Sequence, residues 1–278
     1  MTTSEITQGL LADLHQFAVP RHARWDPLGL MNVRQILRER LRSLGELQEH
    51  SFSNAGEEGI NLILKLPGRN PNRRPLLVGA HYDGPLHSPG ADDNASGVVG
   101  LLELARRWSI NPPRRPVWLV AFDQEEWGMV GSEALACDLK AKGQDLKLMV
   151  SLEMLAFTSE EQAYPHPAMQ EIYGKRGDYI ALVANTSAGL MLPGLCRSMG
   201  RHVKTKVLPV PRKGKDIPEV RLSDHSPFWD QGYRALMVTD TSFMRNPHYH
   251  QMSDTVETLD LPFFCRVIEG LDEAFSRL

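Results

Sequence analysis

Two short, continuous apolar runs constrain the fold of this chain more than any other feature. They are PLLVGAHYD at residues 75–83 and VWLVAF at residues 117–122. A strand that is apolar on both sides is expected in a parallel sheet whose two faces are covered by helices. The same kind of pattern predicts further strands at residues 60–66, 147–155, 179–185 and 234–240.

Helical patterns alternate with these strands along the chain. Ser96 is placed to cap a helix that runs to Ile110. The alternation predicts the α/β class, with a doubly wound, mostly parallel central sheet and helices on both faces. No internal repeat or linker interrupts it, so we expect one domain over residues 1–278. Apolar residues recur at helical spacing in residues 5–18, 32–45, 131–142, 188–199 and 262–278.

The net charge and the composition of the chain disfavour some classes of binding partner. The net charge of −3 disfavours nucleic acid or an anionic membrane as the main partner. The segment at residues 201–221 is basic and contains several prolines, and we expect a solvated loop there. No apolar run reaches 18 residues, so we expect no membrane-spanning helix.

The three cysteines, Cys137, Cys196 and Cys265, each fall in an apolar helical pattern without CxxC spacing. We expect buried thiols, and the odd count disfavours a secreted scaffold held by disulfides. Because the first residues also lack the pattern of a signal peptide, the cytoplasm is the expected location.

Side chains that bind metal ions stand where the predicted strands end. The carboxyl ends of parallel strands meet at one edge of a sheet, so we expect these side chains to converge. Carboxylates buried there without a partner are unfavourable, which implies that a cation meets them. Zinc fits best, because imidazole nitrogen and carboxylate oxygen are its ligands at roughly 2.0 to 2.2 Å. The residues concerned are His81, Asp93, Glu125, Glu126, Glu153 and His250.

The segments around these residues resemble a known family. In order along the chain they are AHYD, PGADDNASG, FDQEEWGMVGS, SLEM, SDHSPF and YHQMSDT, between about residues 76 and 255. Each segment alone is a weak indication of a family, but all six segments in this order and at this spacing are a specific one. It resembles the co-catalytic dizinc exopeptidase family, which includes bacterial leucine-type aminopeptidases, glutamate carboxypeptidase II and glutaminyl cyclase.

The resemblance implies a complete set of metal ligands for two zinc ions per chain. By it, His81 and Glu153 hold one zinc ion, Glu126 and His250 hold the other, and Asp93 bridges the two. It also implies a cis peptide bond between Asp93 and Asn94. Three carboxylates and one bridging hydroxide sum to a charge that two Zn²⁺ ions balance, and Co²⁺ or Mn²⁺ would balance it equally well.

The resemblance further implies catalytic roles for Glu125 and Tyr249, and the strand pattern adds a supporting role for Asp83. Glu125 is expected to act as the general base, taking a proton from the bridging water and passing it to the departing amine. Tyr249 is expected to help to stabilise the oxyanion. Asp83 lies two residues beyond His81 on a strand, on the same face, and is placed to accept the second N–H of the imidazole.

The predicted activity is that of a zinc metallo-aminopeptidase, acting on a peptide or a small amino-acid amide. Glutaminyl cyclisation on the same fold, carboxypeptidase or dipeptidase action, and an inactive binding module remain as alternatives. A carboxypeptidase needs a cation for the terminal carboxylate, for which Arg245 is the nearest candidate by sequence. The walls of the substrate pocket are expected from residues 156–178 and 240–248.

Several other polar residues near these segments have no assigned role. His87 and His248 lie close to proposed ligands in the sequence, and a lone histidine is more often a surface or core residue. His225 in SDHSPF is expected near the pocket, and Asp224 and His225 each either support the fold or contact the metal ligands. The sequence does not predict the oligomeric state.

Overall fold

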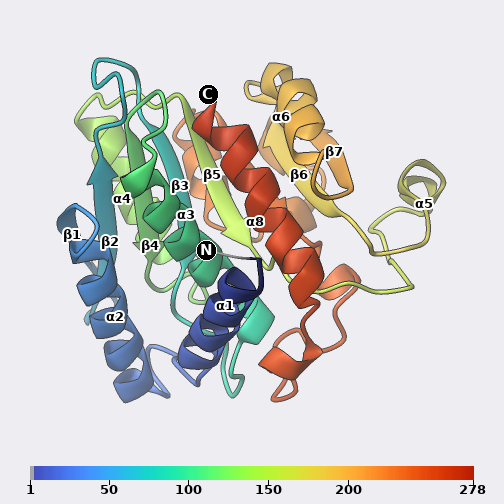
Figure 1. The fold of residues 1–278 in the computed structure, drawn as a ribbon, viewed down its shortest axis with the longest axis horizontal. Helices are drawn as coiled ribbons and strands as arrows, with labels where there is room; N and C mark the ends of the chain where they lie inside the picture. The colour runs from blue at the N-terminus through green and yellow to red at the C-terminus, as the bar shows by residue number, and fades with distance from the viewer. Residues whose placement is uncertain (1–2) are drawn as a thin grey trace.

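A single eight-stranded sheet runs through the molecule, with strand order β1-β2-β4-β3-β5-β8-β6-β7. The computed structural model describes residues 3–278, and Figure 1 shows α1, α3 and α8 in front of the sheet. The strands are β1 (Glu46–Asn54), β2 (Glu57–Leu66), β3 (Leu76–His81), β4 (Val117–Phe122), β5 (Leu148–Glu153), β6 (Ile180–Asn185), β7 (Thr205–Val210) and β8 (Ala235–Thr239). The helices are α1 (Thr3–Phe17), α2 (Pro27–Arg42), α3 (Gly97–Ile110), α4 (Val130–Ala141), α5 (Pro167–Tyr173), α6 (Leu192–Met199), α7 (His225–Asp230) and α8 (Leu261–Ser276).

Helices cover both faces of the sheet, as the doubly wound prediction requires. One buried core joins one face of the sheet to α1, α2, α3, α6 and α8, and includes Phe17, Leu37 and Phe264. A second core joins the other face to α4 and α7, and includes Leu135 and Trp229. The α/β fold with a mostly parallel mixed sheet is therefore confirmed.

Strand direction decides where a site can form. Strands β3, β4, β5 and β8 are parallel to one another, so their carboxyl ends share one edge of the sheet. Strand β6 is antiparallel to β8 and parallel to β7, so β6 and β7 begin at that same edge. The hairpin of β1 and β2 extends the sheet on the far side of β4 with antiparallel pairing.

Three expectations from the sequence are wrong. Residues 201–221 are not only a solvated loop, because Thr205–Val210 form β7, an edge strand paired with β6. Ser96 does not cap α3, because its backbone is already helical and its hydroxyl donates to the carbonyl of Asp92 at 2.8 Å. The cysteines do lie in helices, but Cys137 is exposed and the other two are half-buried, so none is a buried thiol.

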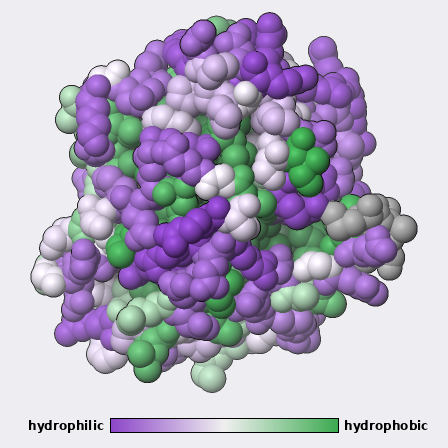
Figure 2. All heavy atoms as spheres, turned by 60° about the vertical axis from the view of Figure 1, so that its left-hand side comes forward, coloured by the Kyte–Doolittle hydropathy of each residue, from purple (hydrophilic) through white to green (hydrophobic). Residues whose placement is uncertain are grey.

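Polar and hydrophobic side chains are unevenly distributed over the surface. The side drawn in Figure 2 is largely hydrophilic, with hydrophobic side chains in small separate groups. Exposed large hydrophobic residues include Trp25, Leu28 and Met31 around the start of α2. Within residues 3–278, every helix is too short or too polar to cross a membrane.

Candidate active site

Five of the side chains singled out in the sequence meet at the shared edge of the sheet. His81 ends β3 and Glu153 ends β5, while Glu126 follows β4 after a short turn. Asp93 lies in the buried turn Ala91–Ser96 before α3, and His250 lies in the loop after β8. The parallel order of these strands therefore brings together residues that are more than 150 positions apart in sequence.

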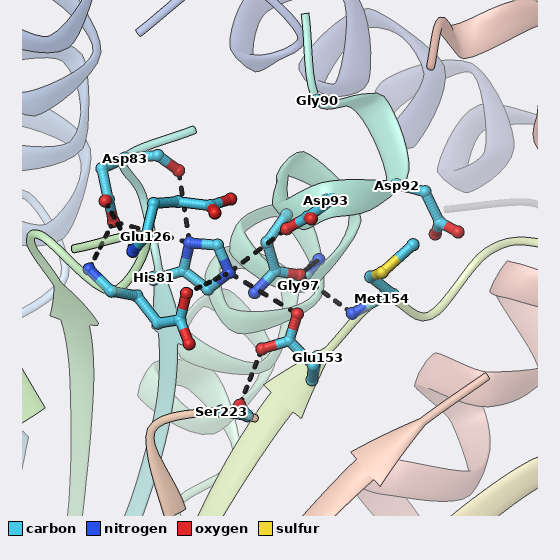
Figure 3. A network of polar contacts seen from close by, with 12 residues as sticks. His81, Asp83, Gly90, Asp92, Asp93, Gly97, Glu126, Glu153, Met154 and Ser223 are labelled. Atoms are coloured by element: carbon cyan, nitrogen blue, oxygen red, sulfur yellow. Dashed lines mark hydrogen bonds and ion pairs between the residues drawn. The ribbon is translucent and has the colours of Figure 1, made fainter. Parts of the chain in front are cut away.

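The two carboxylate oxygens of Asp93 face two different pairs of side chains. Oδ1 of Asp93 lies 3.4 Å from Nε2 of His81, which in turn lies 3.5 Å from Oε1 of Glu153. Oδ2 of Asp93 lies 3.1 Å from Nε2 of His250, which lies 3.4 Å from Oε2 of Glu126. Figure 3 shows His81, Asp93 and Glu153 pointing toward one another. The arrangement defines two three-residue groups, each with ligand atoms within 4.8 Å, that share Asp93.

The donor set fits divalent metal ions of the zinc type. Nε2 of His81 and Oε1 of Glu126 are buried and have no hydrogen-bond partner among the described residues. Imidazole nitrogens and carboxylate oxygens are the groups that zinc binds, and a buried polar atom normally has a partner. Glu125 also lies near, with Oε2 4.0 Å from Nε2 of His81, so a third possible group consists of His81, Glu125 and Glu126.

The pKa shifts of the buried carboxylates and of His81 also favour a bound cation in the cluster. Burial raises the pKa of Glu125 and of Glu126 well above the usual range, and neighbouring carboxylates raise both further. Burial alone would lower the pKa of His81, but Glu153 and Glu125 outweigh it and raise that pKa well above its ordinary value. Excess negative charge in a buried cluster is relieved by a bound cation, which removes the need to take up protons.

Asp83 contacts the cluster differently from the prediction. Nδ1 of His81 hydrogen-bonds the main-chain oxygen of Asp83 at 3.2 Å, and the Asp83 carboxylate lies 3.5 Å away. The carboxylate instead accepts the main-chain N–H groups of Glu125 at 3.0 Å and Glu126 at 3.1 Å. Asp83 therefore fixes the turn that carries both glutamates as well as the imidazole of His81.

Three further residues hold the cluster and were not singled out from the sequence. The hydroxyl of Ser223 donates to Oε2 of Glu153 at 2.7 Å (Figure 3). The carboxylate of Asp254 accepts the main-chain N–H groups of Asp92 and Asp93. Both residues lie in segments that carried the resemblance, SDHSPF and YHQMSDT, which was the available signal. The third is Arg21, whose guanidinium donates to the main-chain oxygens of Tyr82, Gly90 and Asp93.

The peptide bond between Asp93 and Asn94 is cis, as expected from the resemblance. The side chain of Asn94 donates to the main-chain oxygen of Leu152 at 2.9 Å and accepts from Gly97 and Met154. These contacts tie the turn that carries Asp93 to β5.

The remaining polar residues of the sequence prediction belong to none of the metal-binding groups within residues 3–278. His225 is buried, donates from Nε2 to the main-chain oxygen of Val220 at 2.9 Å, and does not line the cavity. Asp224 is also buried, and burial raises its pKa to about 7. His87 is exposed, and His248 contacts Ser253 at 2.9 Å; neither belongs to a metal-binding group within residues 3–278.

A cavity of about 250 Å³ extends from the cluster. Residues 164–173 and 241–244 form part of its wall, as predicted. The prediction was incomplete, because residues 206–208 of β7 and residues 219 and 220 also line it. These residues lie within the segment 201–221, which was expected to be a solvated loop. Its inner wall is apolar and comes from Tyr179, Ala181, Val183, Leu208, Val220 and Met237.

The model of peptidase family M28 matches residues 61–272, which covers most of the chain and every residue of the cluster. The chain belongs to this family, in agreement with the resemblance seen in the sequence.

Relatives and solved structures agree with this assignment. The chain is 35% identical to "Uncharacterized protein YfbL" of Escherichia coli over 70% of its own length and 64% of that protein. It is 29% identical to a probable leucine aminopeptidase of Trichophyton verrucosum over 72% of its length and 52% of that protein, so it spans only part of these relatives. The LapA structure from Legionella pneumophila matches with a TM-score of 0.70 at 18% identity, covering 98% of this chain and 76% of that one. A glutaminyl cyclase structure from Bacteroides thetaiotaomicron matches with a TM-score of 0.69 at 14% identity, covering 98% and 96%.

Proposed function

We propose that this protein is a zinc-dependent exopeptidase that removes residues from the free amino terminus of peptides. The observation that carries the proposal is the placement of the Asp93 carboxylate, with one oxygen toward His81 and Glu153 and the other toward His250 and Glu126. His81 and Glu153 would hold one zinc ion and His250 and Glu126 would hold the other, and Asp93 belongs to both groups. Bound there, the metals would polarise the scissile carbonyl and lower the pKa of an attacking water.

In this proposal Glu125 is the general base. Its backbone is fixed by the Asp83 carboxylate, and its side chain is 14% exposed and lies beside the cluster at the cavity wall. A carboxylate there is within reach of a water near the cluster, and it can return the proton to the leaving amine.

Tyr249 is proposed to stabilise the oxyanion. Its ring stacks on the imidazole of His250, with ring centroids 3.8 Å apart, and it lines the same cavity. Burial raises the pKa of Tyr249 above its ordinary value, and nearby carboxylates raise it further. The hydroxyl therefore remains protonated at neutral pH and can donate a hydrogen bond to developing negative charge.

The charges around the cavity favour attack from the amino terminus. Besides the proposed metal ligands, the carboxylates of Glu125 and Glu219 line it, and such free carboxylates suit a substrate ammonium group. Lys206 also lines it, but its ammonium donates to the main-chain oxygen of Tyr173 and lies over the ring of Tyr179.

Arg245, the candidate anchor for a terminal carboxylate, is directed elsewhere. It is 6% exposed and its guanidinium donates to Gln162 at 3.0 Å and to the main-chain oxygens of Tyr179 and Phe157. It does not line the cavity. These contacts support an aminopeptidase over a carboxypeptidase.

We further propose that the side chain next to the cleaved bond is apolar, because the cavity wall beyond the cluster is apolar. The cytoplasm stays the proposed location, supported by three cysteines that are all unpaired. Fractionation of cells that express the tagged chain would test it.

Metal content tests the proposal, and it separates the peptidase from the cyclase alternative, for which we expect one functional zinc. Elemental analysis of the purified, zinc-saturated chain should give two zinc ions. His81→Ala and His250→Ala should each lose one ion preferentially, since the two histidines belong to different groups. A saturated wild-type chain with one zinc ion, together with release of ammonia from a peptide that begins with glutamine, would favour the cyclase.

A further inference from the structure

The segment between α1 and α2 reaches the back of the metal-binding cluster through one side chain. Arg21 is fully buried, at 0% exposure, although arginine is almost never fully buried without partners. Its main-chain oxygen also accepts the N–H of Gly84 at 3.3 Å. Arg21 lies outside residues 61–272, so it is not among the residues matched to the family.

The guanidinium is bonded almost entirely to the segment that connects His81 with Asp93. Five main-chain oxygens accept its N–H groups, and four of them belong to residues 82–93. The accepting oxygens are those of Tyr82 at 3.0 Å, Val19 at 2.9 Å, Pro89 at 2.5 Å, Gly90 at 2.9 Å and Asp93 at 3.4 Å. One planar cation therefore joins the beginning of this segment, next to His81, to its end at Asp93.

Two glycines in the segment between His81 and Asp93 let its backbone pack closely against the side chain of Arg21. A Cβ atom at Gly90, where φ is +59°, would lie 3.1 Å from Nη2 of Arg21 and 2.1 Å from the main-chain oxygen of Asp93. A Cβ atom at Gly84 would lie 3.0 Å from Cγ of Arg21. Glycine at these two positions allows the close approach, and Figure 3 shows Gly90 at the start of the turn that carries Asp93.

The charge of Arg21 also acts on the cluster. The guanidinium lies near enough to the carboxylates of Asp93, Asp83 and Asp254 to attract them. A fixed internal cation near these carboxylates reduces their mutual repulsion before any metal binds. Lysine cannot take its place fully, because it presents three donors from a single nitrogen whereas arginine presents five in a planar fork.

We infer that Arg21 is a positioning residue of the metal centre: it holds the His81–Asp93 segment so that Asp93 lies between the two metal sites before the ions bind. The inference rests on the proposed function for the identity of the ligands. It makes the segment between α1 and α2 part of the site.

Zinc affinity of the full chain tests this inference. We would titrate metal-free wild type, Arg21→Lys and Arg21→Met with zinc against a chromophoric chelator. Loss of a group that orients a metal ligand typically lowers metal affinity by about 10- to 100-fold, and we expect a fall of this size for Arg21→Met and a smaller one for Arg21→Lys. Exposed Arg24→Met should bind zinc like wild type.

A second control separates positioning from general stability. Val33→Ala removes methyl groups from the buried face of α2, a helix that supplies none of the carbonyls that Arg21 binds, and should lower the melting temperature while leaving zinc affinity unchanged. Gly84→Ala, which presses on the stem of Arg21, should fold and weaken zinc binding in the same direction as Arg21→Lys. If Arg21→Lys and Gly84→Ala both bind two zinc ions with wild-type affinity, the inference is wrong. A wild-type chain that never binds two ions would instead contradict the proposed function.

Discussion

The carboxylate of Asp83 accepts the main-chain N–H of Glu125 at 3.0 Å, and its second oxygen accepts the next N–H along the chain. Asp83 follows β3 and Glu125 follows β4, so this contact joins the ends of two neighbouring strands. It places the proposed general base at a fixed position relative to His81, which lies beside Asp83.

Asp83→Asn should therefore impair turnover. The amide keeps the size of the side chain but replaces one acceptor oxygen with a donor, so one of the two N–H groups loses its partner. We expect kcat to fall about 10- to 100-fold, as for other residues that orient a metal site. Hydrolysis of leucine 4-nitroanilide measures it, with Asp138→Asn on the exposed side of α4 as the matched control. Wild-type kcat in Asp83→Asn would contradict this role.

Glu125 and Glu126 are adjacent but should respond differently to the same change. Glu125→Gln removes the proposed base and should lower kcat by about 10²- to 10⁴-fold, with two zinc ions retained. Glu126→Gln weakens a proposed ligand and should lose one zinc ion. Zinc content and kcat measured together on each variant check the assignment, and the reverse pattern would show that the two roles are exchanged.

Selectivity for the size of the substrate side chain should depend on Ala181, which lies at the apolar wall of the cavity. Ala181→Leu adds three carbon atoms on the cavity side of β6 and should exclude large substrate side chains. One methylene more or less in an apolar pocket already alters discrimination by about 10- to 200-fold. We expect Ala181→Leu to lower the ratio of kcat/KM for leucine 4-nitroanilide over alanine 4-nitroanilide by at least about 10-fold. An unchanged ratio would mean that the side chain binds elsewhere.

His225 should make the fold less stable in acid. Burial lowers the pKa of His225 to about 3, from about 6.5 in an unfolded chain. Between these two values the unfolded chain takes up a proton that the folded chain does not. The contribution of the neutral His225 to the free energy of unfolding is therefore fully present above pH 6.5. It decreases as the pH falls toward 3, by at most about 1.4 kcal/mol per pH unit.

His225→Phe should remove this component, so its free energy of unfolding should fall less steeply than that of wild type between pH 6.5 and pH 4. Urea denaturation of metal-free protein across this range measures the difference, with His15→Gln at an exposed position as the control. Parallel curves for His225→Phe and wild type would show that His225 is protonated in the folded chain.

The sequence predicted the centre of the sheet better than its edges. Strands β3, β4 and β5 are buried along almost their whole length, so their apolar runs identified them. β1 lies at one edge, and its sequence ELQEHSFSN has no continuous apolar run, because most of its side chains reach solvent. β7 lies at the other edge, where lysine and proline are tolerated and conceal the strand.

The site was predictable to the extent that it follows from strand direction. His81, Glu126 and Glu153 converge because parallel strands end at one edge, and the motifs marked those ends. The contacts of Arg21 with residues 82–93 depend on how the segment after α1 packs, and no local pattern encodes that. The wall from residues 206–208 was missed together with β7 itself.

The direction of attack tests the central claim most directly. Two peptides of one sequence, one acetylated at its amino terminus and one amidated at its carboxyl terminus, are incubated with the zinc-loaded chain and analysed by mass spectrometry. We predict stepwise loss of amino-terminal residues from the amidated peptide and no cleavage of the acetylated one, because carboxylates line the cavity and Arg245 is bonded elsewhere. Cleavage of the acetylated peptide with the amidated one left intact would contradict the aminopeptidase.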